Sequence, residues 1–173
     1  MSRSVVTEIQ IHAPLPVVWR ELSDFDSFPE WSTFIREIRG SMVRGSRLEI
    51  ALQPPAREMR VINPVVLKSE PLHEFRWLGG KGVGGILLSG EHFFLLRPLD
   101  RERTVFTHGE TFRGLLLPLR WRSLNSETRR GCAAFNQALK ERCESGQPEP
   151  ESESPEPGAS RPGSSRTARG GEP

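Results

Sequence analysis

The chain has 173 residues, a formal net charge of +2 and a hydrophobic content of 35%. A charge so close to zero argues against a nucleic-acid-binding protein, which normally carries a strongly basic surface. The N-terminus has no apolar run of signal-peptide length, and no later run approaches the ~20 apolar residues of a membrane helix. We therefore expect a cytoplasmic protein without stable membrane insertion.

The first predicted elements are a strand and two short helices. Apolar or β-branched residues recur at every second position from Val5 to Ile11, which indicates a strand. Pro14 ends that strand, and apolar residues then recur at helical spacing up to Asp24. A second short helix is expected around Phe28 and Trp31, with both aromatic side chains directed inward.

Four strand-like runs follow, and glycines and prolines separate them. Such turn residues predict an antiparallel meander. Pro64 lies inside the third run, where it cannot donate a ladder hydrogen bond, so we expect a bulge or an edge strand there. The four runs are residues 35–42, 47–52, 57–68 and 74–78.

Residues 79–85 read GGKGVGG, which invites comparison with a phosphate-binding loop. The P-loop pattern requires a Lys followed by Ser or Thr at the start of a helix, whereas Lys81 is followed by Gly82 and then by another predicted strand. We interpret the segment as a flexible connection between neighbouring strands that could serve as a gate.

Residues 86–114 form the most informative segment, because two alternating runs are joined by a polar turn. A turn centred near Arg101 sets Phe94 opposite His108 and His92 opposite Glu110, close enough for a hydrogen-bonded pair. The mixture of aromatic and titratable side chains predicts either the floor of a ligand pocket or a well-satisfied core. The residues that share this face are His92, Phe94, Leu96, Phe106, His108, Glu110 and Phe112.

A long helix is predicted from about Leu119 to Glu144, with a stripe of apolar or small residues along one side. Thr128 and Gly131 are thin where a helix packed flush against a sheet would carry Leu or Ile, so we expect free space there. Cys132 and Cys143 lie roughly 16 Å apart along this helix, too far to form a disulfide within it. The stripe consists of Leu124, Thr128, Gly131, Cys132, Phe135 and Leu139.

The remaining residues are rich in Pro, Glu, Ser, Gly and Arg. They have no aliphatic residue except Ala159 and Ala168, so they cannot offset the entropy cost of folding. We predict a disordered tail over residues 145–173, and the partner of such a tail, if one exists, stays unknown.

The order of these elements resembles the helix-grip fold of the polyketide cyclase/dehydrase and lipid-transport (START-like, SRPBCC) superfamily, over about residues 3–144. The marker segments are Ala13-Pro14 with Val18-Trp19 and Leu22-Ser23-Asp24, then Phe28-Pro29-Glu30-Trp31, then His92-Phe94-Leu96-Pro98, and finally Thr104-Phe106-His108-Glu110-Phe112-Gly114. The resemblance implies an α+β fold in which a seven-stranded antiparallel sheet wraps around a long C-terminal helix, with two short helices after the first strand. It also implies a ligand-binding domain over residues 1–144.

The resemblance further implies a cavity between sheet and C-terminal helix that holds a hydrophobic small molecule, such as a lipid, a quinone or a polyketide-like compound. His92, His108 and Glu110 are the candidates for catalysis, because a His–Glu pair can serve as a general acid or base. The sequence carries no metal triad or cofactor fingerprint, so no metal and no cofactor is expected. The predicted ligand-binding residues are Trp31, Phe75, Trp77, His92, Phe94, Phe106, His108, Glu110, Phe112, Thr128, Gly131 and Phe135.

Three functions stay open at this point. The first is a carrier or sensor of a hydrophobic ligand. The second is an enzyme of the cyclase, dehydratase or hydrolase kind. The third is an interaction protein of a larger assembly, in which the cavity has collapsed. The residues alone determine neither the ligand nor whether a reaction is catalysed.

Overall fold

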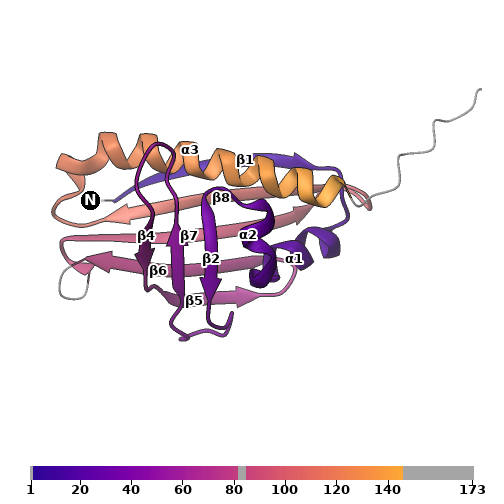
Figure 1. The fold of residues 1–173 in the computed structure, drawn as a ribbon, viewed down its shortest axis with the longest axis horizontal. Helices are drawn as coiled ribbons and strands as arrows, with labels where there is room; N and C mark the ends of the chain where they lie inside the picture. Colours follow the sequence, from indigo (N-terminus) through magenta and orange to yellow (C-terminus); the bar gives the residue numbers. More distant parts are fainter. Residues whose placement is uncertain (1, 82–84, 146–173) are drawn as a thin grey trace, which may run out of the picture.

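The computed structural model describes residues 2–81 and 85–145, which fold into an α+β structure with a long C-terminal helix (Figure 1). The glycine-rich gate predicted at 79–85 falls partly outside the described residues, and the tail predicted at 145–173 falls almost wholly outside them. The elements are β1 (Ser2–Ile11), α1 (Leu15–Ser23), a 3-10 helix (Phe25–Ser27), α2 (Phe28–Trp31), β2 (Ile35–Arg39), β3 (Glu49–Leu52), β4 (Arg60–Ile62), β5 (Val65–Glu70), β6 (Glu74–Lys81), β7 (Leu88–Pro98), β8 (Thr104–Arg113) and α3 (Leu117–Glu144).

The larger sheet has five antiparallel strands in the order β1-β8-β7-β6-β5. Its centre is the hairpin β7–β8, in which Phe94 faces His108 and His92 faces Glu110, so the register predicted from the alternating pattern is confirmed. The turn between the two strands is closed by the Leu99 N–H, which donates to the Arg103 carbonyl over 2.8 Å.

A smaller sheet of three strands, β2-β3-β4, crosses one face of the larger sheet (Figure 1). The third predicted run, 57–68, is not one strand: Pro64 divides it into β4 in the small sheet and β5 in the large sheet. Because proline has no N–H to give to a ladder, the chain turns there from one sheet into the other. If β4 and β5 are counted as one bent strand, the fold has the seven strands that the resemblance implied.

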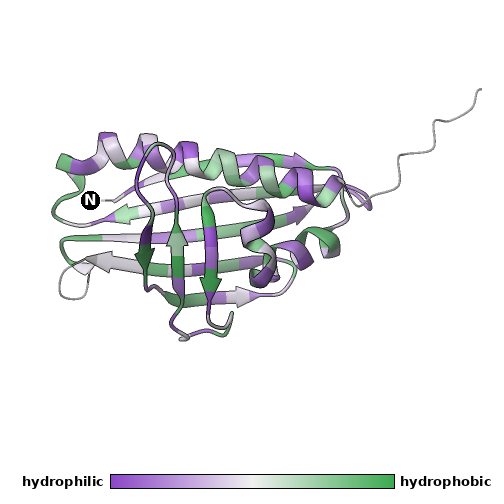
Figure 2. Cartoon of the chain, in the orientation of Figure 1, coloured by the Kyte–Doolittle hydropathy of each residue, from purple (hydrophilic) through white to green (hydrophobic). Residues whose placement is uncertain are grey.

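The long helix α3 packs mainly against β1 and β8. It begins two residues before the predicted start, at Leu117, with Pro118 in the first turn, where a missing N–H costs nothing. All six residues of the predicted stripe are buried. Figure 2 shows apolar and polar segments mixed along the helix, as expected for an element with one face on the sheet and one in solvent. Cys132 and Cys143 do not pair with each other, as their spacing predicts, and both are buried.

Aromatic side chains form the middle of the core, beneath α2 and α3. Phe94 and Phe135 stack with ring centroids 5.4 Å apart, and Phe28 and Trp31 pack against each other and against Phe135. The second short helix thus directs Phe28 fully inward, whereas Trp31 stays half-buried. Among the described residues, no helix is both long enough and apolar enough to cross a membrane.

Candidate ligand-binding site

A pocket of about 380 Å³ lies between the two sheets and α3. Its volume falls within the range of small-molecule sites. One wall comes from the small sheet, the floor from β6, β7 and β8, and the remaining side from α3. The lining residues are Phe34, Leu52, Pro54, Arg60, Val61, Ile62, Asn63, Trp77, Gly79, Gly80, Leu88, Gly90, His92, Glu110, Phe112, Leu124, Glu127 and Thr128.

The floor of the pocket changes from apolar to polar along the hairpin. The His92 ring stacks on the Trp77 indole with a centroid distance of 4.4 Å and an interplanar angle of 8°. On the facing strand, Phe112 is buried and Glu110 keeps 24% of its side chain exposed. The floor of the site therefore combines aromatic surface with polar groups on two neighbouring strands, a combination that can orient an apolar ligand through a hydroxyl or carbonyl.

His92 is the outer member of a chain of buried hydrogen bonds. Its Nε2 lies 2.8 Å from Nε2 of His108, and Nδ1 of His108 lies 2.9 Å from Oδ1 of Asn136. The Asn136 amide donates through Nδ2 to the Thr7 hydroxyl over 3.0 Å, and that hydroxyl donates to the His108 carbonyl over 2.9 Å. The chain thus connects β7, β8, α3 and β1.

The chemistry of the groups fixes the direction of every bond in this chain. The Thr7 hydroxyl gives its only proton to the His108 carbonyl, so it must accept from the Asn136 amide, and the carbonyl oxygen of Asn136 then faces His108. His108 must donate from Nδ1 to that oxygen. A neutral His108 therefore presents an unprotonated Nε2, to which Nε2–H of His92 donates.

Burial keeps His108 neutral. The side chain is fully enclosed, and this desolvation, together with the nearby His92, holds the pKa of His108 well below its ordinary value. As a result, the lone pair on Nε2 of His108 stays available at neutral pH. Because this lone pair accepts a hydrogen bond from His92, a neutral His92 carries its proton on Nε2.

Nδ1 of His92 is the end of the chain that faces the pocket. It lies 3.8 Å from Oε2 of Glu110, which is an ionic contact once His92 is protonated and too long for a direct hydrogen bond. The hydrogen-bonded pair expected between His92 and Glu110 is therefore replaced by a bond from His92 to His108. Glu110 lies over Gly90, where a Cβ atom would clash with the Glu110 carboxylate, so a side chain at position 90 would displace it.

The mouth of the pocket carries an ionic cluster from two elements. Nη2 of Arg57 lies 2.8 Å from Oε1 of Glu127, and the Ser123 hydroxyl donates to the same oxygen over 2.6 Å. These hydrogen bonds, chiefly the one from Ser123, lower the pKa of Glu127. The positive charges of Arg57 and Arg60 lower it further. The ionised Glu127 ties α3 to the loop before β4 at the edge of the pocket.

Five of the twelve predicted ligand-binding residues line the pocket: Trp77, His92, Glu110, Phe112 and Thr128. His108 lies directly behind His92, outside the pocket lining. Four other predicted residues are buried in the aromatic core and do not reach the pocket, and Trp31 is half-buried beside them. These four are Phe75, Phe94, Phe106 and Phe135.

The free space expected at Gly131 is absent. A Cβ atom at this position would lie 2.6 Å from Cζ of Phe34, so the phenyl ring already occupies the space that a thin residue leaves. The glycine does permit a close approach, but by the protein's own ring and not by a ligand. Phe34, which follows α2, then forms part of the pocket wall on its other side.

Sequence reasoning missed the wall contributed by the small sheet. Leu52, Arg60 and Ile62 come from strands of three or four residues, whose pattern is too short to reveal which side faces a cavity. Gly79, Gly80 and Gly90 were also missed as lining residues. The glycine-rich composition near position 80 was the one available signal, because glycines in a strand let another group approach the backbone closely.

One group of three potential metal ligands comes together within residues 2–81 and 85–145: Glu70, His73 and Glu74. Lys68 lies 3.1 Å from Glu70 and also pairs with Glu74, and Arg76 pairs with Glu74 as well. These cations already neutralise the carboxylates, and the group lies apart from the pocket lining.

Comparison with solved structures shows where this architecture recurs. Norcoclaurine synthase from Thalictrum flavum, in complex with dopamine and hydroxybenzaldehyde, has a TM-score of 0.65 at 10% identity, with 86% of this chain and 90% of that chain covered. The Zhui aromatase/cyclase from Streptomyces sp. R1128 has a TM-score of 0.68 at 14% identity, with 83% and 94% covered. A START superfamily protein from Mycobacterium smegmatis has a TM-score of 0.66 at 17% identity, with 82% and 97% covered.

No curated protein matches the chain significantly. The family model described as polyketide cyclase / dehydrase and lipid transport matches residues 2–144, which is almost all of the described structure. Its match agrees with the fold seen in the structural relatives and with a pocket enclosed by sheet and helix. The chain therefore belongs to the polyketide cyclase / dehydrase and lipid transport family.

Proposed function

We propose that this protein binds a hydrophobic small molecule in the pocket between its two sheets and α3, as a carrier or sensor. One observation carries the proposal: a pocket of about 380 Å³ whose floor places the aromatic ring of Trp77 beside an oriented polar group, Nδ1 of His92. Apolar contact supplies affinity, about 25 cal/mol per Å² of buried apolar surface, and the polar group selects a ligand with one hydroxyl or carbonyl.

The first experiment identifies the ligand. The full-length protein is purified as expressed, extracted with organic solvent and analysed by mass spectrometry. We expect a lipid, quinone or polyketide-like compound in stoichiometric amount. The absence of any such compound, together with no saturable binding of a fluorescent polyene fatty acid, would contradict the proposal.

A pair of variants on α3 then locates the binding site. Thr128→Phe places a ring in the pocket, because Thr128 lines it and is 7% exposed. We expect affinity for the polyene fatty acid to fall at least about tenfold, since the ring competes for the same volume. Ala133→Phe is the matched control, because Ala133 lies on the exposed side of the same helix. Equal affinity in both variants would place the ligand elsewhere.

A catalytic role in the same pocket is the second candidate, and the direction of the hydrogen-bond chain favours it. Neutral His92 presents an unprotonated Nδ1 beside Glu110, which suits removal of a proton from a carbon or hydroxyl next to a carbonyl. Two of the structural relatives carry enzyme names. With a poly-β-ketone analogue, His92→Phe and Glu110→Gln should each abolish ring closure or dehydration if the protein is an enzyme, and should only change affinity if it is a carrier.

A further inference from the structure

We propose that the end of the molecule at which α3 begins is a docking surface for an anionic lipid bilayer. The surface, here called the leucine tip, has five exposed aliphatic residues: Ile86, Leu87, Leu115, Leu116 and Leu119. It lies at the opposite end of the molecule from α1 (Figure 1). The proposal concerns a surface outside the pocket and does not require any particular ligand.

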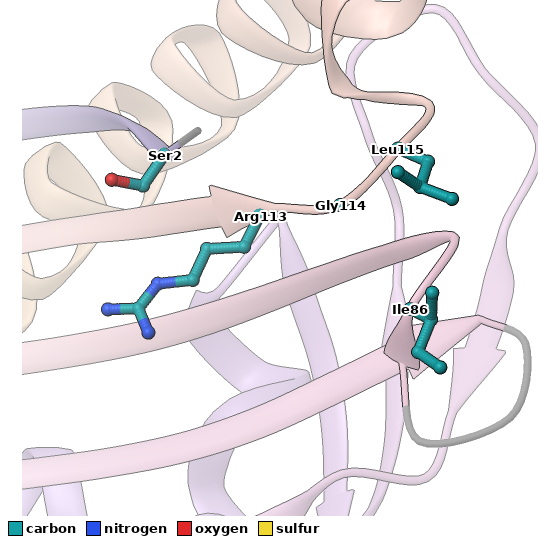
Figure 3. Close-up of a pocket in the computed structure, with 5 residues that line it drawn as sticks. All are labelled: Ser2, Ile86, Arg113, Gly114 and Leu115. Carbon is teal, nitrogen blue, oxygen red and sulfur yellow. The ribbon is translucent and has the colours of Figure 1, made fainter.

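The leucine tip is built from two connections that hydrogen bond to each other. The N–H of Leu115 donates to the Ile86 carbonyl over 3.2 Å, and the N–H of Leu116 donates to the Leu87 carbonyl over 3.0 Å. Figure 3 shows Ile86 and Leu115 on these two connections, beside a shallow depression that they share with Ser2, Arg113 and Gly114. The aliphatic side chains are therefore held together as one surface.

The exposure of these residues is unusual for a protein in water. Leu119 is 82% exposed, Leu115 is 74% exposed and Ile86 is 60% exposed. A scattered surface leucine needs no explanation, but a contiguous group of exposed aliphatic residues marks an interaction site. The neighbouring Leu117 is fully buried, so the sequence Leu115-Leu116-Leu117 places only its third member in the core.

The charge around the leucine tip points to an anionic partner. From Thr111 to Ser126 every charged residue is an arginine: Arg113, Arg120 and Arg122. None of the three forms an ion pair within the part of the chain that the structure describes. The Arg3 guanidinium lies 5.2 Å from the centre of the Trp121 ring and adds a fourth positive charge nearby.

Leucine, tryptophan and arginine on one small surface form the composition of an interfacial membrane anchor. A stable protein interface takes roughly 20 to 30 residues from each partner. A bilayer, by contrast, needs only aliphatic side chains that enter the headgroup region and positive charges that attract anionic lipids. Leu88, which follows the tip residue Leu87, lines the pocket, so docking brings the bilayer next to the site.

Vesicle flotation with the full-length protein tests the proposal. We expect the protein to float with vesicles of equimolar phosphatidylcholine and phosphatidylglycerol, and to remain largely unbound with pure phosphatidylcholine. Leu115→Ser with Leu119→Ser should lower partitioning at least about tenfold, because two aliphatic side chains no longer enter the bilayer. Arg113→Gln with Arg120→Gln should lower partitioning onto the mixed vesicles roughly fivefold per arginine, and should make the partitioning less sensitive to salt.

The matched control is Val43→Ser with Leu99→Ser, two exposed aliphatic residues away from the tip, which should float like the wild type. Thermal melting checks that each variant is folded. Three results would overturn the proposal: no flotation with the mixed vesicles, unchanged flotation of the leucine variant, or equal flotation with pure phosphatidylcholine. A concentration-dependent dimer that the leucine variant loses would assign the tip to a second copy instead. Because flotation does not report pocket occupancy, a failed ligand search leaves this result unaffected.

Discussion

His108 is a histidine that the fold permits only in its neutral form. Its pKa is lowered by burial and by His92, whereas an unfolded chain keeps the ordinary value of 6.5. Between these two values the unfolded chain binds a proton that the folded chain does not, so stability falls as the pH drops below 6.5. We expect a slope approaching about 1.4 kcal/mol per pH unit.

Urea denaturation between about pH 7.5 and pH 5 measures this slope, because carboxylates with lowered pKa values contribute only at lower pH. A flat free energy of unfolding over this range would show that His108 is protonated in the folded protein.

His92 should be coupled more strongly to His108 than to Glu110. His92→Phe leaves the buried Nε2 of His108 without a donor, which should cost about 1 to 3 kcal/mol. Glu110→Gln should cost less than about 1 kcal/mol, because the carboxylate is partly exposed and lies 3.8 Å from His92. Double-mutant cycles by chemical denaturation compare the two couplings. A larger coupling between positions 92 and 110 would show that the hydrogen-bond chain runs differently.

At the scale of elements, the contact between α3 and the segment before β2 depends on one glycine. Replacing glycine by alanine in a helix normally stabilises it by about 1 kcal/mol. Here Gly131→Ala should destabilise the protein by about 1 to 3 kcal/mol, because the new methyl group overlaps the Phe34 ring. In a protein that already carries Phe34→Leu, adding Gly131→Ala should lower the free energy of unfolding by less than it does in the wild type. Stabilisation by Gly131→Ala, measured by urea denaturation, would mean that the ring moves away freely.

How far the sequence could predict each element depended on the length of its pattern. The hairpin β7–β8 has about ten residues per strand, enough alternation to set the register of His92 and Glu110. The strands β2 to β4 have three to five residues each and carry no such signal, so the pocket wall that they form was missed. Asn136 was missed as a partner of His108 because the two are 28 positions apart and meet only when α3 docks.

At the scale of the whole molecule, residues 146–173 should be dispensable for folding. The end of α3 is held by contacts that lie before them: the His12 N–H donates to Glu144 over 2.7 Å, and Arg142 pairs with Glu21 over 3.0 Å. Truncation after Ser145 should therefore change the melting temperature by a few degrees at most. Truncation after Glu141 is the control, because it removes Arg142 and the buried Cys143 and should lower the melting temperature clearly. A large loss of stability on truncation after Ser145 would show that residues 146–173 have a structural role.

The chain of hydrogen bonds behind the pocket has one end, His92, that lines the pocket. Thr7, Asn136 and His108 form a ring that returns to the His108 main chain, whereas the His92 imidazole lines the pocket and meets water from that side. A molecule seated against His92 would shield the imidazole from that water. The rate at which the imidazole N–H protons of His92 and His108 exchange with deuterium, followed by NMR, should then report occupancy of the pocket without any label on the ligand.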